Sequence, residues 1–127
     1  MRSGSPRLTI MAALTGFAGV ALGAFGAHGL EGRLSSQGGE WWDTATLYGL
    51  THAASALAIA LSGRSGLTRL GGWLFLVGSV IFAGTLYAMA LGAPSILGAV
   101  TPAGGLALLA GWALCAIAAI REHNSRS

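Results

Sequence analysis

Residues 70–91 read LGGWLFLVGSVIFAGTLYAMAL, a run of 22 residues that holds no Asp, Glu, Lys or Arg. A helix needs about 20 mostly apolar residues to cross the hydrocarbon core of a bilayer. A chain inside hydrocarbon must also satisfy its own backbone N–H and C=O groups, which a helix does within one segment. The alternation of apolar and polar residues that is typical of transmembrane barrel strands is absent. The segment is therefore predicted to be a membrane-spanning helix.

Three more stretches have the same character, and none of them contains a charged residue: residues 8–25, 44–61 and 98–120. With residues 70–91 they predict an all-α integral membrane protein, in which residues 1–127 form a single domain of four spans. The connections are short except the first, so consecutive helices are expected to lie antiparallel and adjacent. The predicted fold is a four-helix bundle with up-down-up-down topology.

The composition favours the lipid bilayer as the main partner. Hydrophobic residues make up 54 % of the chain and charged residues 9 %, whereas soluble domains have about 25 % charged residues. The net charge is +3, but the arginines are spread over the ends of the predicted spans and do not form a basic cluster. Nucleic acid is therefore not an expected partner.

The arginines also predict the orientation of the spans. Six of the seven flank the ends of the chain or the connection between the second and third spans: Arg2, Arg7, Arg64, Arg69, Arg121 and Arg126. Cytoplasmic flanks of membrane proteins are enriched in Lys and Arg. Both termini are therefore predicted to be cytoplasmic, in a multi-pass protein of the bacterial inner membrane. Arg33 is the exception.

The connection between the first two spans, residues 26–43, is predicted to lie outside. Trp41 and Trp42 close it, and amphipathic rings favour the headgroup layer. The first span also has the positive start of a cleaved signal peptide, with small residues near a cleavage point at residues 24–27. Its apolar stretch is long for that role, so a retained first span is the favoured interpretation.

Small residues recur on one face of several spans, which lets helices approach closely in lipid. The stripes contain Gly16, Gly19 and Gly23 in the first span, Ala45 and Gly49 in the second, and Ala103, Ala107 and Gly111 in the fourth. One interpretation is packing within the bundle. The other is that a stripe mediates a homo-oligomer or docking to a larger membrane complex.

Polar residues are expected to converge in the outer half of the bundle. The candidate pocket consists of His28, Tyr48, His52, Thr85, Tyr87 and Thr101. His52 lies well inside the second span, and ionisable groups there usually face the bundle or a wet cavity. It is either a neutral imidazole that fixes the helix by hydrogen bonding, or a group that handles a proton or a ligand.

Catalytic, metal and cofactor motifs are absent from the sequence. Cys115 is the single cysteine, so no CxxC pair exists, and no GxSxG motif is present. Two histidines without a nearby carboxylate or thiol make a poor metal site. We therefore expect neither a metal nor a cofactor.

The same residues carry a resemblance to a known family. GAFGAHGL at residues 23–30, TA at 44–45 followed by Tyr48 and His52, FAGTLY at 82–87, and TPAGG at 101–105 followed by Gly111 and Trp112 are similar to motifs of the YgdD-like family. The resemblance implies a small bacterial inner-membrane protein with four helices and a retained first span. That family has no established activity, so the resemblance implies no mechanism.

The sequence is compatible with three kinds of function. The first is a non-enzymatic accessory or assembly protein that acts through its small-residue helix faces. The second is a small transporter, channel or sensor of pH or a ligand, which would use the pocket around His52. The third, a membrane enzyme, lacks acid, base and metal partners in the sequence.

Overall fold

The computed structural model describes residues 4–127, so Arg2 of the first arginine pair lies outside the described residues. Four long helices follow one another: α1 (Pro6–His28), α2 (Ser36–Ser62), α3 (Gly66–Ala90) and α4 (Thr101–Ser125), with a short 3-10 helix, η1 (Ser95–Ala99), before the last. All four are long and apolar enough to cross a membrane. The prediction of four spanning-length helices is therefore confirmed.

The start of α2 differs from the prediction because a capping residue, not hydropathy, sets it. The Ser35 side chain accepts a hydrogen bond from the Gly38 backbone N–H at 2.9 Å, which satisfies one of the free amides of the first turn. The helix therefore begins at Ser36, eight residues before the predicted start at Thr44. Trp41 and Trp42 consequently lie inside the helix rather than before it.

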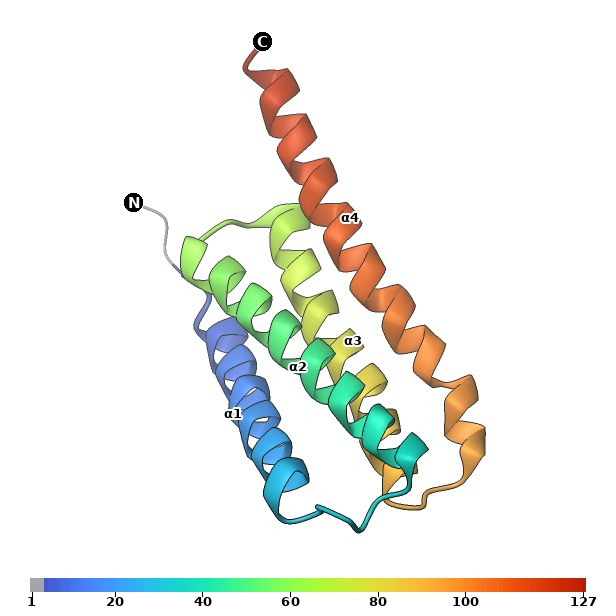
Figure 1. The fold of residues 1–127 in the computed structure, drawn as a ribbon. Helices are drawn as coiled ribbons and strands as arrows, with labels where there is room; N and C mark the ends of the chain where they lie inside the picture. The colour runs from blue at the N-terminus through green and yellow to red at the C-terminus, as the bar shows by residue number, and fades with distance from the viewer. Residues whose placement is uncertain (1–3) are drawn as a thin grey trace.

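The last helix extends past its apolar stretch. Residues 98–100 belong to η1 and its end, and α4 runs from Thr101 to Ser125. Its final turns carry Arg121 and Glu122 and project beyond the other three helices (Figure 1). A span predicted from hydropathy ends before the first charged residue, Arg121, whereas the backbone hydrogen bonds of the helix continue to Ser125.

The helices are arranged with α2 and α3 at the centre. α1 packs mainly on α2, and α4 packs mainly on α3 and touches η1 (Figure 1). The described start of the chain, the α2–α3 connection and the C-terminus lie at one end of the molecule, and the other two connections lie at the opposite end. The edge helices α1 and α4 are therefore the most open to their surroundings.

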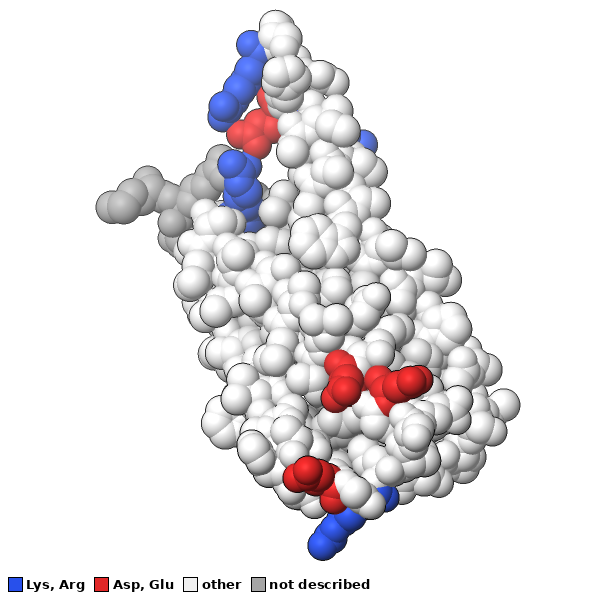
Figure 2. All heavy atoms as spheres, in the orientation of Figure 1, with Lys and Arg blue, Asp and Glu red and all other residues white. Residues whose placement is uncertain are grey.

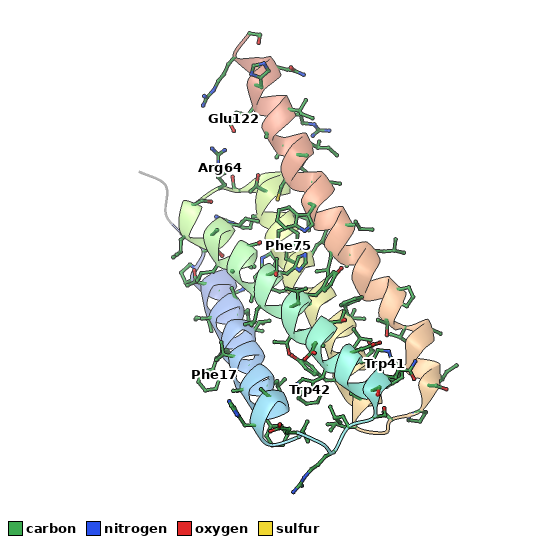
Figure 3. The ribbon with its side chains drawn as sticks, viewed as in Figure 1. Phe17, Trp41, Trp42, Arg64, Phe75 and Glu122 are labelled. Carbon is green, nitrogen blue, oxygen red and sulfur yellow. The ribbon has the colours of Figure 1, made fainter. Side chains whose placement is uncertain are left out.

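Two groups of buried apolar side chains hold these helices together. The first contains Leu8, Ala12, Ala56, Ala60, Phe75, Leu76 and Leu108, and the second contains Ala45, Ala83, Leu86 and Met89. Outside them, many large apolar side chains are exposed; Phe17, for example, points away from the bundle and is 76 % exposed (Figure 3). An apolar exterior of this kind suits lipid.

Charged side chains are confined to the two ends. Figure 2 shows arginine side chains mainly at the end that holds the chain termini, then a broad uncharged belt, and carboxylates toward the opposite end. At the first end, Glu122 forms ion pairs with Arg64 at 2.7 Å and with Arg126 at 2.9 Å (Figure 3). The charge distribution thus follows the long axis of the molecule.

Candidate functional site

The six polar residues of the predicted outer pocket are distributed over three separate hydrogen-bonded contacts and an exposed helix end. His52 and the backbone carbonyl of Tyr48 belong to the first contact, Tyr87 to the second, and Thr85 and Thr101 to the third. His28 is exposed at the end of α1, and the Tyr48 side chain is exposed as well. His52 contacts Phe75 and Trp112 near the middles of α3 and α4, whereas Thr101 begins α4, so the six residues share neither one level nor one point.

His52 is buried and hydrogen-bonded through both ring nitrogens. The Trp112 indole N–H donates to His52 Nε2 at 3.0 Å, and an indole nitrogen can only donate. His52 Nε2 must therefore accept, which places the ring proton on Nδ1. Nδ1 then donates to the Tyr48 carbonyl at 2.7 Å. The geometry assigns a neutral imidazole of defined tautomer.

The same imidazole is part of an aromatic cluster that links three helices. Its ring lies 5.3 Å from Phe75 and 5.8 Å from Trp112, and those two rings are 4.7 Å apart. α3 separates α2 from α4, so the His52–Trp112 bond joins two helices that are not direct neighbours. The bond therefore links α2 to α4 across α3.

Tyr87 belongs to a second contact, which ties together α1, α2 and α3. Its hydroxyl shares a 2.6 Å hydrogen bond with the Thr46 hydroxyl. The Trp42 ring lies 4.5 Å from the Tyr87 ring, and the Trp42 N–H donates to the Leu22 carbonyl at 2.8 Å. Trp42 is only 3 % exposed. This indole is therefore enclosed by the three helices and does not face the surroundings; its predicted depth at the headgroup layer stays a prediction.

The third contact closes the start of α4 against α3. The Thr85 and Thr101 hydroxyls are 2.7 Å apart, and a carbonyl of the same chain segment lies within hydrogen-bonding distance of each, Ile81 O for Thr85 and Leu97 O for Thr101. Each hydroxyl has one proton, so one donates to the other, which then donates to its own carbonyl. The pair stabilises the α3–α4 contact and leaves little free hydrogen-bonding capacity.

Glycines bring the backbones of α3 and α4 into direct contact. A Cβ atom added at Gly104 would lie 2.5 Å from the Phe82 backbone nitrogen, and one added at Gly78 would lie 2.9 Å from Gly104 O. Farther along, a Cβ at Gly111 would lie 3.0 Å from Gly71 O and 2.7 Å from Phe75 Cδ1. This interface can accept no side chain at these positions without moving the helices.

The buried glycines of α4 begin at Gly104, one residue after Ala103, where the predicted stripe of small residues begins. Ala103 is exposed and Ala107 half-buried, whereas Gly104, Leu108 and Gly111 are buried. One residue corresponds to about 100° of rotation around a helix. The contact face is therefore centred on the Gly104 side of α4, which a count of small residues could not distinguish.

The other small residues of the predicted stripes lie between α1, α2 and α3. A Cβ added at Gly19 would lie 2.7 Å from Leu50, and one at Gly23 would lie 2.8 Å from Thr46. Gly16 is more loosely placed, at 3.9 Å from the Ala53 Cβ. Ala45 and Gly49 are buried in α2. These positions are used for packing within the chain.

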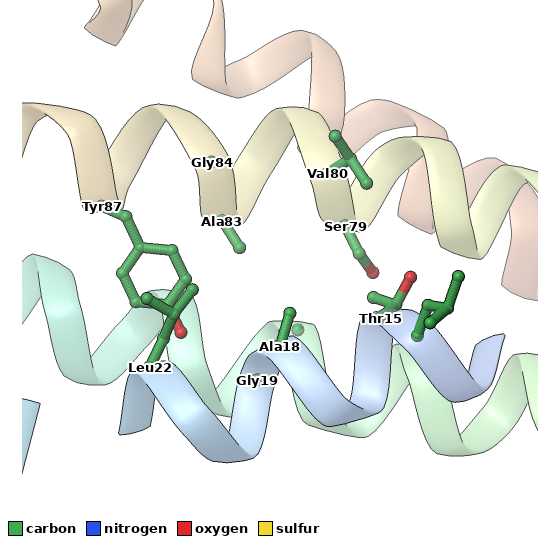
Figure 4. Close-up of a pocket in the computed structure, with 11 residues that line it drawn as sticks. Thr15, Ala18, Gly19, Leu22, Ser79, Val80, Ala83, Gly84 and Tyr87 are labelled. Carbon is green, nitrogen blue, oxygen red and sulfur yellow. The ribbon is translucent and has the colours of Figure 1, made fainter. Parts of the chain in front are cut away.

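An apolar groove lies between α1 and α3, with α2 as its floor. It has a volume of about 290 Å³. Its lining includes Thr15, Gly19 and Leu22 from α1, Gly49 from α2, and Ser79, Ala83 and Gly84 from α3 (Figure 4). The Ser79 and Thr15 side chains point toward one another across it.

Ser79 differs from the other hydroxyls of the helices. Six lie within hydrogen-bonding distance of the carbonyl of the fourth preceding residue: Thr9, Thr15, Thr51, Ser55, Thr85 and Thr101. Ser79 is 1 % exposed, and its oxygen has no partner among residues 4–127. An unpaired buried polar group costs about 1–3 kcal/mol. Arg69 Nε is also buried without a partner among residues 4–127, but it lies in the first turns of α3, whereas Ser79 lies near the middle of that helix.

Sequence reasoning missed Ser79 and Trp112 as site residues. The signal for Trp112 was present, because an indole N–H inside a span needs an acceptor and His52 is the imidazole available there. Nothing in the sequence distinguishes Ser79 from the serines and threonines that bond to their own helix. Among residues 4–127, no group of three or more His, Cys, Asp or Glu side chains could hold a metal ion.

These features define a class of protein: a small integral membrane protein of four apolar helices, whose in-span polar side chains mostly form hydrogen bonds within the chain. Within that class, the family is shown by its sequence. The model of the family described as "Protein of unknown function (DUF423)" matches residues 22–105. The chain belongs to this family. The match begins within α1 and ends in the first turn of α4.

Similar proteins carry the name UPF0382 membrane protein. One from Staphylococcus epidermidis is 44 % identical over 84 residues, which cover 65 % of this chain and 69 % of the relative. YwdK of Bacillus subtilis is 39 % identical over 65 % of this chain and 70 % of its own length. A Schizosaccharomyces pombe relative is 40 % identical over 64 % of this chain and 70 % of its own length. No solved structure matches the chain.

Proposed function

We propose that the four helices cross a bacterial inner membrane as an up-down-up-down bundle with both termini in the cytoplasm. The distribution of arginines supports this orientation, because Arg7, Arg64, Arg69, Arg121 and Arg126 all belong to the segments at one end of the molecule. The resemblance to YgdD-like proteins supports the inner membrane.

Single cysteines test the orientation. Gln37→Cys, at the start of α2, and Ser65→Cys, before α3, are introduced separately into a Cys115→Ala background. A membrane-impermeant maleimide added to intact spheroplasts is expected to label position 37 and to label position 65 only after lysis. The opposite pattern would reverse the orientation.

The function that these features support best is a non-enzymatic accessory or assembly role, in which α4 docks on another membrane protein. The observation that carries this proposal is the free outer face of α4. Leu106, Leu109, Ile117 and Ile120 are all exposed, the first two at 66 % each. Their spacing of three, eight and three residues, with Ala113 between, places them on one side of the helix.

The remaining polar groups favour this role over chemistry or transport. His52, Tyr87, Thr85 and Thr101 all make hydrogen bonds within the chain. A proton or substrate path needs groups that are free to exchange partners. A small transporter, channel or sensor at His52 is therefore the less supported alternative.

A matched pair of variants tests the docking face. Leu109→Ala with Ile117→Ala reduces the exposed apolar face of α4, and Ile10→Ala with Phe17→Ala makes a comparable change on α1. The protein is extracted in lipid nanodiscs from its own membrane and weighed by native mass spectrometry. We expect a stoichiometric complex that survives the α1 change and is lost with the α4 change.

Two results would contradict the proposal. One is a monomer in every sample, and the other is equal loss of the complex in both variants. A complex whose mass is a multiple of this chain identifies the partner as a second copy.

A further inference from the structure

We propose that the groove between α1 and α3 binds a compact, lipid-soluble molecule that carries one carbonyl oxygen, and that the Ser79 hydroxyl donates a hydrogen bond to it. This site is separate from the docking face of α4 and does not depend on it. The starting observation is Ser79 itself, which is 1 % exposed, points into the groove and has no partner among the described residues (Figure 4).

The hydrogen-bonding inventory of the groove favours an acceptor. Two other hydroxyls line the groove. Thr15 donates its proton to the Met11 carbonyl at 2.8 Å, and Tyr87 shares a 2.6 Å hydrogen bond with Thr46. Of the three hydroxyls, only that of Ser79 has no hydrogen-bond partner among residues 4–127. A carbonyl oxygen accepts the Ser79 proton and brings no donor of its own, and unpaired donors are rarer than under-used acceptors in proteins.

The depth of Ser79 separates this ligand from ordinary membrane lipids. Ser79 is 13 residues from the start of α3 at Gly66 and 11 from its end at Ala90. At a rise of about 1.5 Å per residue it lies near the middle of the helix. Ester groups of bilayer lipids lie in the interfacial layer outside the hydrocarbon core. The carbonyl must therefore belong to a molecule that enters the core as a whole.

The size and the opening of the groove set the shape of the ligand. The volume of about 290 Å³ is near the lower end of small-molecule pockets, which span about 300–1,000 Å³. Gly84 and Val80 line it and are exposed, and a Cβ atom added at Gly84 would meet nothing within 4 Å. Entry is therefore from the lipid side, past a residue without a side chain.

Benzophenone is the probe, because it is a compact lipid-soluble ketone that crosslinks on illumination. The full chain in phosphatidylcholine nanodiscs is labelled, and the adducts are mapped by mass spectrometry. We expect saturable labelling within residues 14–22 and 79–87. Gly84→Leu is expected to abolish it by closing the entrance, whereas Ala54→Leu, at an exposed position on α2, leaves it unchanged.

Competition tests the hydrogen bond separately from the shape. Dicyclohexyl ketone and dicyclohexylmethane have similar shapes and differ in the carbonyl. In the unaltered chain the ketone should compete at roughly threefold to tenfold lower concentration, the ratio that one hydrogen bond supplies. In Ser79→Ala the two should compete equally. Ser55→Ala removes a hydroxyl that is bonded to Thr51 O and should retain the difference.

Three results would overturn the proposal. These are labelling spread over all lipid-facing helices, equal competition by ketone and hydrocarbon in the unaltered chain, and insensitivity to Gly84→Leu. A dimer whose formation protects the groove from labelling would also overturn it, because the occupant would then be a second copy. None of these readouts depends on the α4 complex, so the docking proposal can fail independently.

Discussion

The α3–α4 interface and the α1–α3 groove are both lined by small residues, yet one is closed and the other open. At the first, Gly78 and Gly104 let two backbones touch, and a Cβ at either would lie within 3 Å of backbone atoms. At the second, Gly84 has open space beside it, and Gly49 lies at the floor. A glycine in a membrane helix therefore either brings helices together or leaves room for something else, depending on the face it occupies.

The largest expected change in unfolding free energy comes from adding one methyl group at the closed α3–α4 interface, with the same addition at the open groove as its counterpart. Gly104→Ala places a Cβ 2.5 Å from the Phe82 nitrogen, where only backbone movement can relieve the overlap. Overpacking of this kind costs about 1–3 kcal/mol, so we expect the unfolding free energy to fall by that amount. Gly84→Ala meets no neighbour and should raise it by about 0.5 kcal/mol, because alanine is the better helix former.

Both variants are measured by reversible unfolding in mixed micelles with increasing dodecyl sulfate. Equal effects of the two substitutions would remove the distinction between the closed interface and the open groove.

A smaller change in unfolding free energy is expected when the hydrogen bond between α2 and α4 is removed. His52→Ala removes the acceptor of the Trp112 N–H and a donor to the Tyr48 carbonyl. Interhelical hydrogen bonds in membrane proteins contribute about 0.6 kcal/mol on average and up to about 1.7. A double-mutant cycle of His52→Ala with Trp112→Phe should give a coupling energy within that range, measured by the same unfolding assay.

The cycle also separates the two interpretations of His52. A coupling energy near zero, together with loss of a proton or solute flux in liposomes that contain His52→Ala, would support a functional imidazole. Loss of stability without any flux supports the structural one.

The sequence predicts the four helices well and the positions of their polar groups only partly, for a physical reason. Apolar runs without charges fix how many segments could cross a bilayer, and each of the four runs overlaps a helix that is at least as long as a span requires. The third run exceeds α3 by one residue, and the fourth begins three residues before α4. Depth along a helix also follows from residue number. The rotation of each helix does not, because it results from packing against neighbours. Ala103 and Gly104 are adjacent in sequence, yet one is exposed and the other buried.

The smallest expected effect is a gain in stability when Ser79, in the open groove between α1 and α3, is replaced. Ser79→Ala removes a buried hydroxyl that has no partner among residues 4–127, whereas Ser55→Ala removes one that is bonded to its own helix. Relief of the unpaired polar group, partly offset by the packing lost with the oxygen atom, should raise the unfolding free energy of ligand-free protein by up to about 1 kcal/mol. Ser55→Ala should change it by less than about 0.5 kcal/mol, as expected for most exposed positions.

This last comparison separates a site from a packing defect. If Ser79→Ala is more stable without a ketone but loses its response to one, the hydroxyl lowers the stability of the empty fold and contributes only when the groove is filled. That pattern is expected of binding residues, since stability and function often oppose one another at such positions. If Ser79→Ala is instead less stable, the hydroxyl has a structural partner, and the groove loses the one polar group that distinguishes it from a gap between helices.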